Sequence, residues 1–261
     1  MPMDHAGEHL LREGRNQSAD NLRFLEEIPR YWEESPGSIN AKLENFTKYV
    51  SREALTRLLA RNEIFLKQLD VPGSVVELGV ARGASLMLWA HLSAIYEPTN
   101  YTREIIGFDT FSGIPATAKQ DTGSEGVSPR VKVGGFAFEP HMKADIERAV
   151  RIHDRTRYLG HIPKVRLVEG PIEQTLPEFV KANPHLVVSL LHADTDLYEP
   201  TRLALTLLRP RIPKGGVILF DELNCRLFPG ETAALADTLG ISSLRLRRLR
   251  YAPNLGYAVV E

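Results

Sequence analysis

The sequence predicts an α/β protein in which a mostly parallel sheet is covered by helices on both faces. After Pro72-Gly73, short β-rich runs alternate with helical runs along the chain. Two of the apolar runs end in pairs of acids, at Asp194 and at Asp221, and are too short for anything but buried strands. This alternation is typical of a parallel sheet with helical crossovers.

Residues from about 18 to 69 have the pattern of two helical segments, interrupted by the breaker cluster Ser35-Pro36-Gly37. Ser51 is a good N-cap candidate for the second segment. That segment has an apolar face at helical spacing, formed by Leu55, Leu58, Leu59, Phe65, Leu66 and Leu69. We therefore expect residues 1–70 to form an amino-terminal helical extension and residues 71–261 to form the main domain.

The remaining elements follow in alternation. The runs expected to form strands are SVVEL, REIIGF, KVRLV, HLVVSLLHA and GGVILF, and the helical runs between and after them are ASLMLWAHLSAIY, HMKADIERAVRIH, LPEFVKAN, PTRLALTLL and ETAALADTLG. The tail differs, because SLRLRRLRY and NLGYAVVE are separated by Ala252-Pro253. We expect these two runs to form an antiparallel hairpin at one edge of the sheet, since the arginines of the first largely alternate with leucines.

One long connection, residues 110–139, joins the strand that ends at Asp109 to the helix near residue 140. Loops longer than about 12–15 residues in compact domains are usually lids, binding loops or disordered segments. We interpret this connection as a lid on the substrate side of the sheet. A tolerated surface insertion is the alternative.

Composition limits the class of protein. The chain has 261 residues, of which 43% are hydrophobic and 25% charged, which fits one α/β domain with additions at the amino end. The net charge of −1 gives no overall attraction to nucleic acid or to an anionic membrane. The single cysteine, Cys225, excludes an internal disulfide, and no signal peptide or spanning segment is recognisable, so we expect a cytoplasmic protein.

The first predicted strand runs into the glycine loop Glu77-Leu78-Gly79-Val80-Ala81-Arg82-Gly83. A dinucleotide site would prefer G-x-G-x-x-G, but here Ala81 replaces the central glycine and the third glycine is absent. Asp109 ends the next strand, where an acid can bind a ribose diol or cap its own turn. Glu77, Gly79 and Asp109 together favour a nucleoside pocket without a pyrophosphate cradle.

Two acid pairs follow predicted strands: Asp194 with Asp196, and Asp221 with Glu222. Parallel sheets bind ligands at the carboxyl ends of their strands, so we expect these acids to converge on one site. The alternative is that they cap the following helix or occupy a turn. His141 and His192 are secondary candidates for proton transfer or substrate contact.

The chain resembles the macrocin- and mycinamicin-type sugar O-methyltransferases of antibiotic biosynthesis. The resemblance covers residues 45–261 and rests on VVELGVARGAS, IIGFDTFSGIP, VEGPIEQTLPEF, LLHADTDLYEPTRLAL and PKGGVILFDELN. It implies a Rossmann-like class I methyltransferase fold with a seven-stranded sheet, S-adenosylmethionine at the glycine loop, and a magnesium ion. It also implies a sugar hydroxyl as acceptor, and amino-terminal helices that cover the active site and help to build a homo-oligomer.

The resemblance places Asp194, Asp221 and Glu222 at the family's metal-binding positions and Asp196 at its general-base position. The sequence departs from the family pattern at Glu222, where an aspartate is usual, and at His192, where an arginine is common. His141 is the second catalytic candidate. The expected S-adenosylmethionine site consists of Glu77, Gly79, Ala81, Ser85, Asp109, Thr110, Phe111, Gly170, Ile172, Glu173 and Asp194.

The chemistry gives a physical reason for these acids. A sugar hydroxyl is a poor nucleophile at neutral pH, and a divalent ion that polarises its oxygen lowers the cost of losing the proton to a nearby carboxylate. We therefore predict a metal-dependent O-methyltransferase that acts on a deoxysugar, either on a natural-product glycoside or on a nucleotide diphosphate. Three alternatives remain: a catechol-type phenol O-methyltransferase, a non-catalytic assembly subunit with the same fold, and a nicotinamide oxidoreductase.

Overall fold

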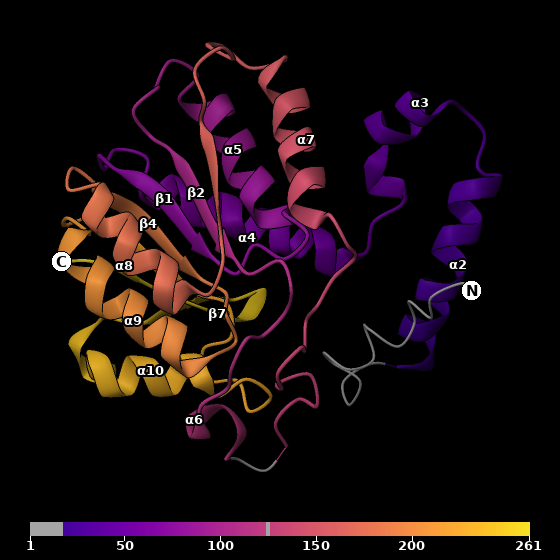
Figure 1. Ribbon diagram of the computed structural model, residues 1–261. Coiled ribbons are helices and arrows are strands. Elements are labelled where there is room, and N and C mark those ends of the chain that lie inside the picture. Colours follow the sequence, from indigo (N-terminus) through magenta and orange to yellow (C-terminus); the bar gives the residue numbers. More distant parts are fainter. Residues whose placement is uncertain (1–17, 124–125) are drawn as a thin grey trace.

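The computed structural model describes residues 18–123 and 126–261. Its amino-terminal region contains α2 (Ala19–Glu34), α3 (Ile39–Glu44), the short 3₁₀ helix η1 (Phe46–Lys48) and α4 (Arg52–Lys67). Ser51 caps α4 as predicted, because its hydroxyl accepts a hydrogen bond of 3.1 Å from the Ala54 N–H. In Figure 1, α2 and α3 stand apart from the sheet, whereas α4 lies against it.

The buried face of α4 differs from the one expected from its leucines. Ala60, Arg61, Ile64 and Phe65 are buried, whereas Leu59 and Leu66 are 55% and 43% exposed. The prediction for these two leucines was wrong, because the helix turns its Ala60–Phe65 stripe toward the sheet and carries Leu59 and Leu66 to the outside. An arginine therefore occupies a position at which an apolar residue is usual.

The centre of the molecule is the predicted mostly parallel sheet of seven strands, within the described residues. Its strands are β1 (Ser74–Leu78), β2 (Ile105–Asp109), β3 (Val165–Glu169), β4 (Val188–Ala193), β5 (Val217–Phe220), β6 (Arg247–Leu249) and β7 (Ala252–Val259). They lie in the order β3-β2-β1-β4-β5-β7-β6. The strand order reverses direction between β1 and β4, and such a switch point is where open α/β sheets bind ligands.

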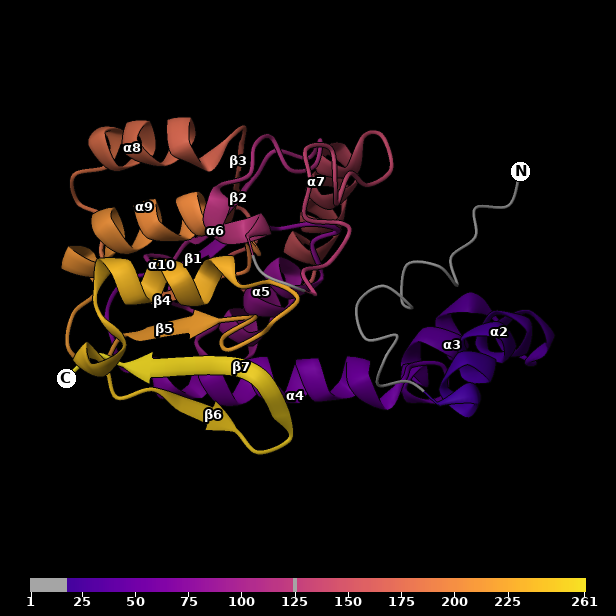
Figure 2. The same ribbon diagram turned by 90° about the horizontal axis from the view of Figure 1, so that it is seen from below.

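Helices cover both faces of this sheet, as predicted. The helices that follow β1 are α5 (Ala84–Tyr96), α7 (Met142–Asp154), α8 (Ile172–Ala182), α9 (Tyr198–Leu208) and α10 (Gly230–Thr238). The short helix α6 (Lys119–Thr122) lies in the 110–139 connection, and η2 (Arg209–Arg211) and η3 (Ile241–Ser243) are short 3₁₀ helices. Figure 2 shows α8, α9 and α10 in a row on one face, with α4, α5 and α7 on the other. Each face has its own buried hydrophobic cluster.

The parallel strands end level with one another. Leu78 pairs with Phe108 on β2 and with Ala193 on β4, and Ala193 pairs with Phe220 on β5. Backbone hydrogen bonds continue this alignment by one residue, because the Asp194 N–H donates to the Leu78 carbonyl at 2.9 Å and the Asp221 N–H donates to the Ala193 carbonyl at 3.0 Å. The aligned register therefore brings residues far apart in the chain to one edge of the sheet.

The carboxyl-terminal residues form the expected antiparallel hairpin, β6 and β7, with β6 at the sheet edge. The position of its turn differs from the prediction. Ala252 and Pro253 belong to β7, and the turn lies at Arg250 and Tyr251. Proline is tolerated near the start of a strand, so Pro253 does not mark the break between the two strands.

The connection 110–139 is partly packed against the domain. Ile114 and Val131 form a small buried cluster with Leu197 and Phe228, which lie beyond β4 and β5. The buried Asp121 of α6 accepts hydrogen bonds of 2.7 Å from the N–H groups of Tyr198 and Ala118. These contacts attach the connection to the start of α9.

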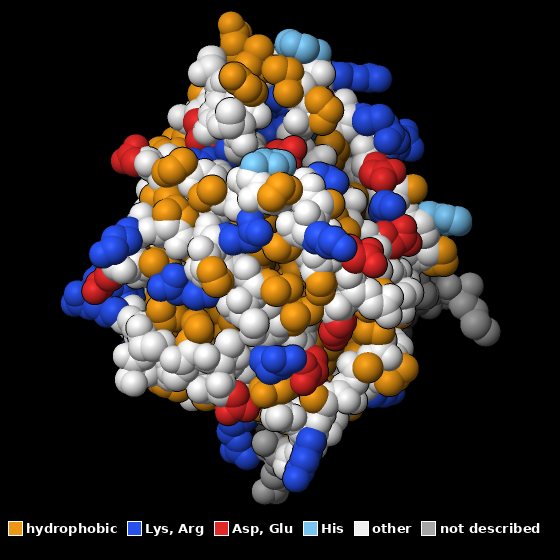
Figure 3. Space-filling model, turned by 60° about the vertical axis from the view of Figure 1, so that its left-hand side comes forward, with side chains coloured by type: hydrophobic (Ala, Val, Ile, Leu, Met, Phe, Trp, Pro, Cys, Tyr) orange, Lys and Arg blue, Asp and Glu red, His pale blue; other side chains and the backbone are white. Residues whose placement is uncertain are grey.

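No helix in the described part of the chain combines the length and the apolar character needed to cross a membrane. On the face of the molecule drawn in Figure 3, acidic and basic side chains are interspersed rather than gathered by sign. This face therefore offers no large patch of one charge, in keeping with the net charge of −1.

Candidate active site

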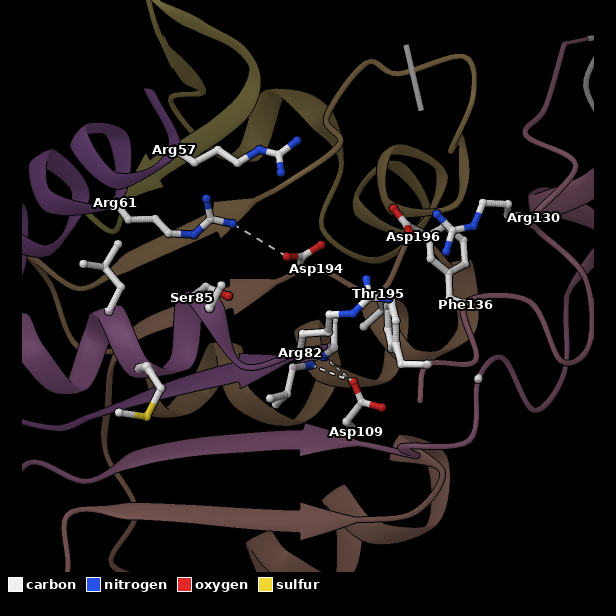
Figure 4. A pocket seen from close by; sticks show the side chains of 18 of the residues that line it. Arg57, Arg61, Arg82, Ser85, Asp109, Arg130, Phe136, Asp194, Thr195 and Asp196 are labelled. Carbon is white, nitrogen blue, oxygen red and sulfur yellow. Dashed lines mark hydrogen bonds and ion pairs between the residues drawn. The ribbon is translucent and has the colours of Figure 1, made fainter. Parts of the chain in front are cut away.

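A cavity of about 1120 Å³ opens at the carboxyl ends of β1, β2 and β4. Its walls come from the glycine loop, α4, α5, the 110–139 connection and the residues after β4. Pockets for small molecules usually measure about 300–1,000 Å³, so this cavity is slightly larger than a usual single-ligand pocket. Figure 4 shows Asp109 at one end, and Asp194 with Asp196 farther along the cavity.

The glycine loop is held close to the exit of β4. Gly79 has a φ of +87°, and a Cβ added there would lie 1.9 Å from the Asp194 carbonyl oxygen. Only glycine fits this position, because it adopts the backbone angle and leaves room for the neighbouring chain.

Asp109 holds the same loop from the other side. Its Oδ2 accepts hydrogen bonds of 2.8 Å from the N–H groups of Val80 and Ala81, and its Oδ1 accepts one of 2.7 Å from the Phe111 N–H. The turn-capping role considered as an alternative is therefore present. Burial raises the pKa of Asp109, while these N–H donors oppose that shift.

Glu77 lies beneath the cavity rather than in its wall. It is fully buried, and its carboxylate accepts hydrogen bonds from Ser85 Oγ at 2.9 Å and Trp89 Nε1 at 2.6 Å. His192 Nδ1 lies 3.2 Å from the same carboxylate. Glu77 thereby positions the first turns of α5 and the ring of His192.

A cluster at the carboxyl ends of β4 and β5 consists of the side chains of His192, Asp194 and Asp221. One ligand atom from each lies within 4.8 Å of the others. His192 Nε2 is 3.9 Å from Asp194 Oδ2 and 3.7 Å from Asp221 Oδ1. Within the described residues this is the group whose donor atoms are close enough to hold one metal ion.

Arg61 of α4 reaches into this cluster. Its Nη2 lies 3.1 Å from Asp221 Oδ1 and 3.7 Å from Asp194 Oδ2, and its side chain is 8% exposed. Figure 4 shows Arg61 pointing at Asp194, with Arg57 beside it. The amino-terminal helix thus supplies a buried cation to two acids that lie more than a hundred residues farther along the chain.

The cluster changes the protonation of its members. Burial lowers the pKa of His192, but its interactions with Asp221 and Glu77 outweigh burial and raise that pKa to about 9. Burial and the charge of Asp221 raise the pKa of Asp194 to about 7. The hydrogen bonds to Asp221 and Glu77 therefore favour the protonated form of His192.

Asp196 and Glu222 are joined through Glu231. The buried Glu231 of α10 accepts a hydrogen bond of 3.2 Å from the Asp196 N–H and one of 3.1 Å from the Glu222 N–H. Asp196 has a φ of +60°, in the left-handed region that non-glycine residues rarely adopt. Glu222 is buried and does not belong to the group formed by His192, Asp194 and Asp221.

The structure brings most of the predicted site residues to the cavity. Those that line it are Gly79, Ala81, Ser85, Asp109, Thr110, Ile172, Glu173, Asp194 and Asp196. The predicted residues outside its wall are Glu77, Phe111, Gly170, Asp221, Glu222 and His141. His141 is exposed at the start of α7, with a φ of 68°.

Several lining residues were not singled out from the sequence. Phe24, Arg57 and Arg61 come from the amino-terminal helices, and Arg130 comes from the 110–139 connection. For Arg61 there was a signal, since it lies one helical turn before Phe65 on the buried face of α4. A buried arginine on such a face needs a partner of opposite charge.

A model of the macrocin-O-methyltransferase (TylF) family matches residues 50–236. The chain belongs to this family. The predicted resemblance and the predicted class I methyltransferase fold are confirmed. The predicted enzyme class, an S-adenosylmethionine-dependent O-methyltransferase, is that of the family. All the cavity residues named in this section except Phe24 lie inside the matched range.

Relatives agree with this assignment. A crystal structure of CalS11, a calicheamicin methyltransferase, has a TM-score of 0.89 and 33% identity over 94% of each chain. An apo structure of CalS11, described as a TDP-rhamnose 3'-O-methyltransferase, has a TM-score of 0.81 and 29% identity over 94% of this chain and 96% of that one.

Two curated relatives come from Streptomyces. One, from Streptomyces olivaceus, is a tetracenomycin-C rhamnosyl 4'-O-methyltransferase that is 28% identical over 70% of this chain and 73% of its own length. The other is the demethyldecarbamoylnovobiocin O-methyltransferase of Streptomyces niveus, with 31% identity over 59% of this chain. The match spans 53%, about half, of that second relative.

Proposed function

We propose that this protein transfers the methyl group of S-adenosylmethionine to a hydroxyl of a deoxysugar that is carried on a nucleoside diphosphate, with the help of a divalent cation. One observation carries the proposal: a single cavity joins the glycine loop and Asp109 to Asp194 and Asp196. A donor bound at the first end and a hydroxyl bound at the second would be held in contact, and positioning supplies much of the rate of such a transfer.

The donor end would be formed by Gly79, Asp109, Thr110, Ile172 and Glu173. The absence of a side chain at Gly79 lets the glycine loop lie directly against the Asp194 carbonyl at the wall of the cavity. Asp109 fixes the loop through three backbone N–H groups, so its role includes shaping the pocket as well as the predicted contact with ribose.

Asp194 and Asp221 fit a divalent cation. They are carboxylates from adjacent strand exits, the oxygen ligands that magnesium prefers, and they already attract the guanidinium of Arg61. We propose that these two acids hold the cation, with Glu222 as the third acid expected from the sequence. When bound, such an ion would polarise the acceptor oxygen and ease its loss of a proton.

Asp196 is the proposed general base. It lies at the cavity wall two residues beyond Asp194, and Figure 4 shows it beside Arg130, away from Arg61. Its carboxylate would accept the hydroxyl proton while the oxygen forms a bond to the methyl carbon and the methyl–sulfur bond breaks. S-adenosylhomocysteine and the methyl ether would be the products.

Two arginines support a charged acceptor. Arg57 lines the cavity beside Arg61, and Arg130 lines it where its guanidinium lies 4.0 Å from the centre of the Phe136 ring. Arginines recognise phosphate oxygens well, and an aromatic ring beside them can receive a sugar or a base. CalS11 is described as acting on TDP-rhamnose, which has these groups.

The amino-terminal region and the 110–139 connection would cover this reaction. Phe24, Ser51 and Arg57 reach the cavity from one side, and Ile114 and Arg130 from the other. We propose that the first is an active-site cover and the second a lid that excludes water. The exposed apolar residues Ile39 and Leu43 of α3 support the expected homo-oligomer.

The test is an acceptor panel incubated with S-adenosylmethionine and magnesium, read by product mass. We expect TDP-rhamnose to gain one methyl group, and a methyl rhamnoside and catechol to remain unmodified. Methylation of catechol in preference to the nucleotide sugar would favour the phenol alternative. Methylation of the rhamnoside as readily as TDP-rhamnose would remove the diphosphate from the proposal.

A further inference from the structure

Glu231 is a fully buried acid that touches both strand exits without lining the cavity. It lies in the first turn of α10, and its side chain is 0% exposed. Its Oε1 accepts the Asp196 N–H at 3.2 Å, and its Oε2 accepts the Glu222 N–H at 3.1 Å. One side chain therefore joins the segment after β4 to the segment after β5.

This link begins where the sheet ends. The β4–β5 ladder ends at the pair Ala193 and Phe220, and the Asp221 N–H still bonds to the Ala193 carbonyl. Beyond that point the two segments separate, and the N–H groups of Asp196 and Glu222 have no strand partner. Buried N–H groups need an acceptor, and Glu231 supplies both.

The backbone at Asp196 makes this support important. A non-glycine residue at a φ of +60° keeps that angle only where its surroundings fix it. The hydrogen bond to Glu231 is made by the peptide group of Asp196 itself. A change at Glu231 would therefore alter the direction in which the Asp196 carboxylate enters the cavity.

The residue type also fits this task. Two N–H groups on different segments need two acceptor oxygens on one side chain, and a carboxylate offers both. A glutamine of the same shape offers only one.

We propose that Glu231 is a positioning residue for methyl transfer, which joins the exits of β4 and β5 and thereby orients Asp196 relative to Asp221. The inference rests on the proposed function, because Asp196 and Asp221 have their roles from it. Glu231 would act through its hydrogen bonds to the backbone, since it does not line the cavity.

The direct test is amide hydrogen exchange by NMR on the full chain, with Glu231→Gln. We expect exchange at the N–H of Asp196, Glu222 or both to become about 10-fold faster or more, because one of them now faces the donor NH₂ group. The N–H groups of Asp194 and Asp221 are internal controls, since they bond to backbone carbonyls. Unchanged exchange at Asp196 and Glu222 would overturn the proposal.

The functional test uses TDP-rhamnose as the acceptor probe. We expect Glu231→Gln to lower kcat by about 10-fold or more while the affinity for S-adenosylhomocysteine stays within about 2-fold of the wild type. The matched control is Glu178→Gln, an exposed glutamate on α8, which should leave both values unchanged. An unchanged kcat in Glu231→Gln would overturn the positioning role.

A second variant separates positioning from general instability. Glu231→Asp keeps both oxygens but is one methylene shorter, so it should retain the fold and still lose kcat. Loss of S-adenosylhomocysteine affinity in both variants, together with faster exchange at the Asp194 and Asp221 controls, would contradict the proposal. If the wild type itself fails to methylate, the proposed function is wrong, whereas the exchange result still decides whether Glu231 holds the two segments.

Discussion

Asp194 and Asp196 are two residues apart in the chain but have different neighbours. Asp194 lies beside Arg61 and His192, so its charge is engaged within the cluster. Asp196 is rotated out of the strand by its positive φ, its backbone is held by Glu231, and its side chain lies beside Arg130 rather than Arg61. This difference separates the two proposed roles, cation binding for Asp194 and proton acceptance for Asp196.

Replacing Asp196 by asparagine should stop proton acceptance with little change in shape. We expect the turnover of Asp196→Asn to fall by about 100-fold to 10,000-fold, the usual contribution of a general base. Binding of S-adenosylhomocysteine, measured by calorimetry, should be unchanged because the donor end is built by other residues. The exposed Asp145→Asn on α7 is the control. Full turnover in Asp196→Asn would remove Asp196 from the role of base.

Arg61 should compete with a divalent ion for Asp194 and Asp221. Replacing it by methionine removes the positive charge but keeps an apolar stem of similar length. We expect Arg61→Met to bind Mn²⁺ about 10-fold more tightly, measured by electron paramagnetic resonance, because two acids lose a cationic neighbour. Arg61→Lys, which keeps the charge, is the control. Equal or weaker Mn²⁺ binding by Arg61→Met would show that the two acids do not form the metal site.

At the level of single residues, the sequence predicted the acids of the site better than the residues that contact them. Asp194 and Asp221 could be brought together from the sequence, because each follows a strand and parallel strands end at one edge. Arg61 could not be assigned to them, since its contact depends on how α4 packs against the sheet. Glu231 carries no strand-end signal at all, and its link to Asp196 depends on the position of α10.

The packing of α5 against α7 includes two histidines. The rings of His91 and His153 lie 4.3 Å apart between centres, in an edge-to-face arrangement. Burial lowers the pKa of both histidines, and the neighbouring His91 lowers that of His153 further. Protonation of both imidazoles would place two positive charges this close together, which is unfavourable.

Acid should therefore loosen this pair of helices. The ordinary pKa of His153 is 6.5, and its value in the folded protein is lower, so below pH 6.5 the unfolded chain binds a proton that the folded one does not. The contribution of neutral His153 to the free energy of unfolding is fully present above pH 6.5. It is lost as the pH falls through the lower pKa that His153 has in the folded protein. We expect the Tm, measured by calorimetry, to fall from about pH 7 to about pH 5.

The matched variants are His153→Phe and the exposed His185→Phe. The first should reduce the dependence of Tm on pH, because phenylalanine can keep the edge-to-face contact without taking a proton. The second should leave that dependence as it is in the wild type. Identical pH profiles for wild type and His153→Phe would assign the acid sensitivity to other groups.

Elements were predicted well where the chain alternates and less well where packing decides. The parallel strands and their helices follow directly from the hydrophobic pattern. For α4 the predicted apolar face was right at Phe65 but wrong at Leu59 and Leu66, which point outward. The turn between β6 and β7 was placed two residues late, since Pro253 is accommodated in the strand.

The whole molecule explains why the cavity lies where it does. The level strand ends and the switch point between β1 and β4 create a cleft. The amino-terminal helices line this cleft on one side, and the 110–139 connection lines it on the other. The position of the cleft could be predicted from the fold class. The residues that line its walls could not be predicted in this way. Arg57 and Arg130 reach the cleft from segments whose packing over the sheet is not indicated by local sequence patterns.

We propose that these parts act together in a cation-assisted methyl transfer to a sugar hydroxyl. The most direct measurement is the mass of TDP-rhamnose after incubation of the purified protein with methyl-deuterated S-adenosylmethionine, with magnesium and with a chelator. We predict transfer of one deuterated methyl group with magnesium and a large loss of product with chelator. Equal product in both conditions would contradict the role of the cation, and no product in either would contradict the proposed acceptor.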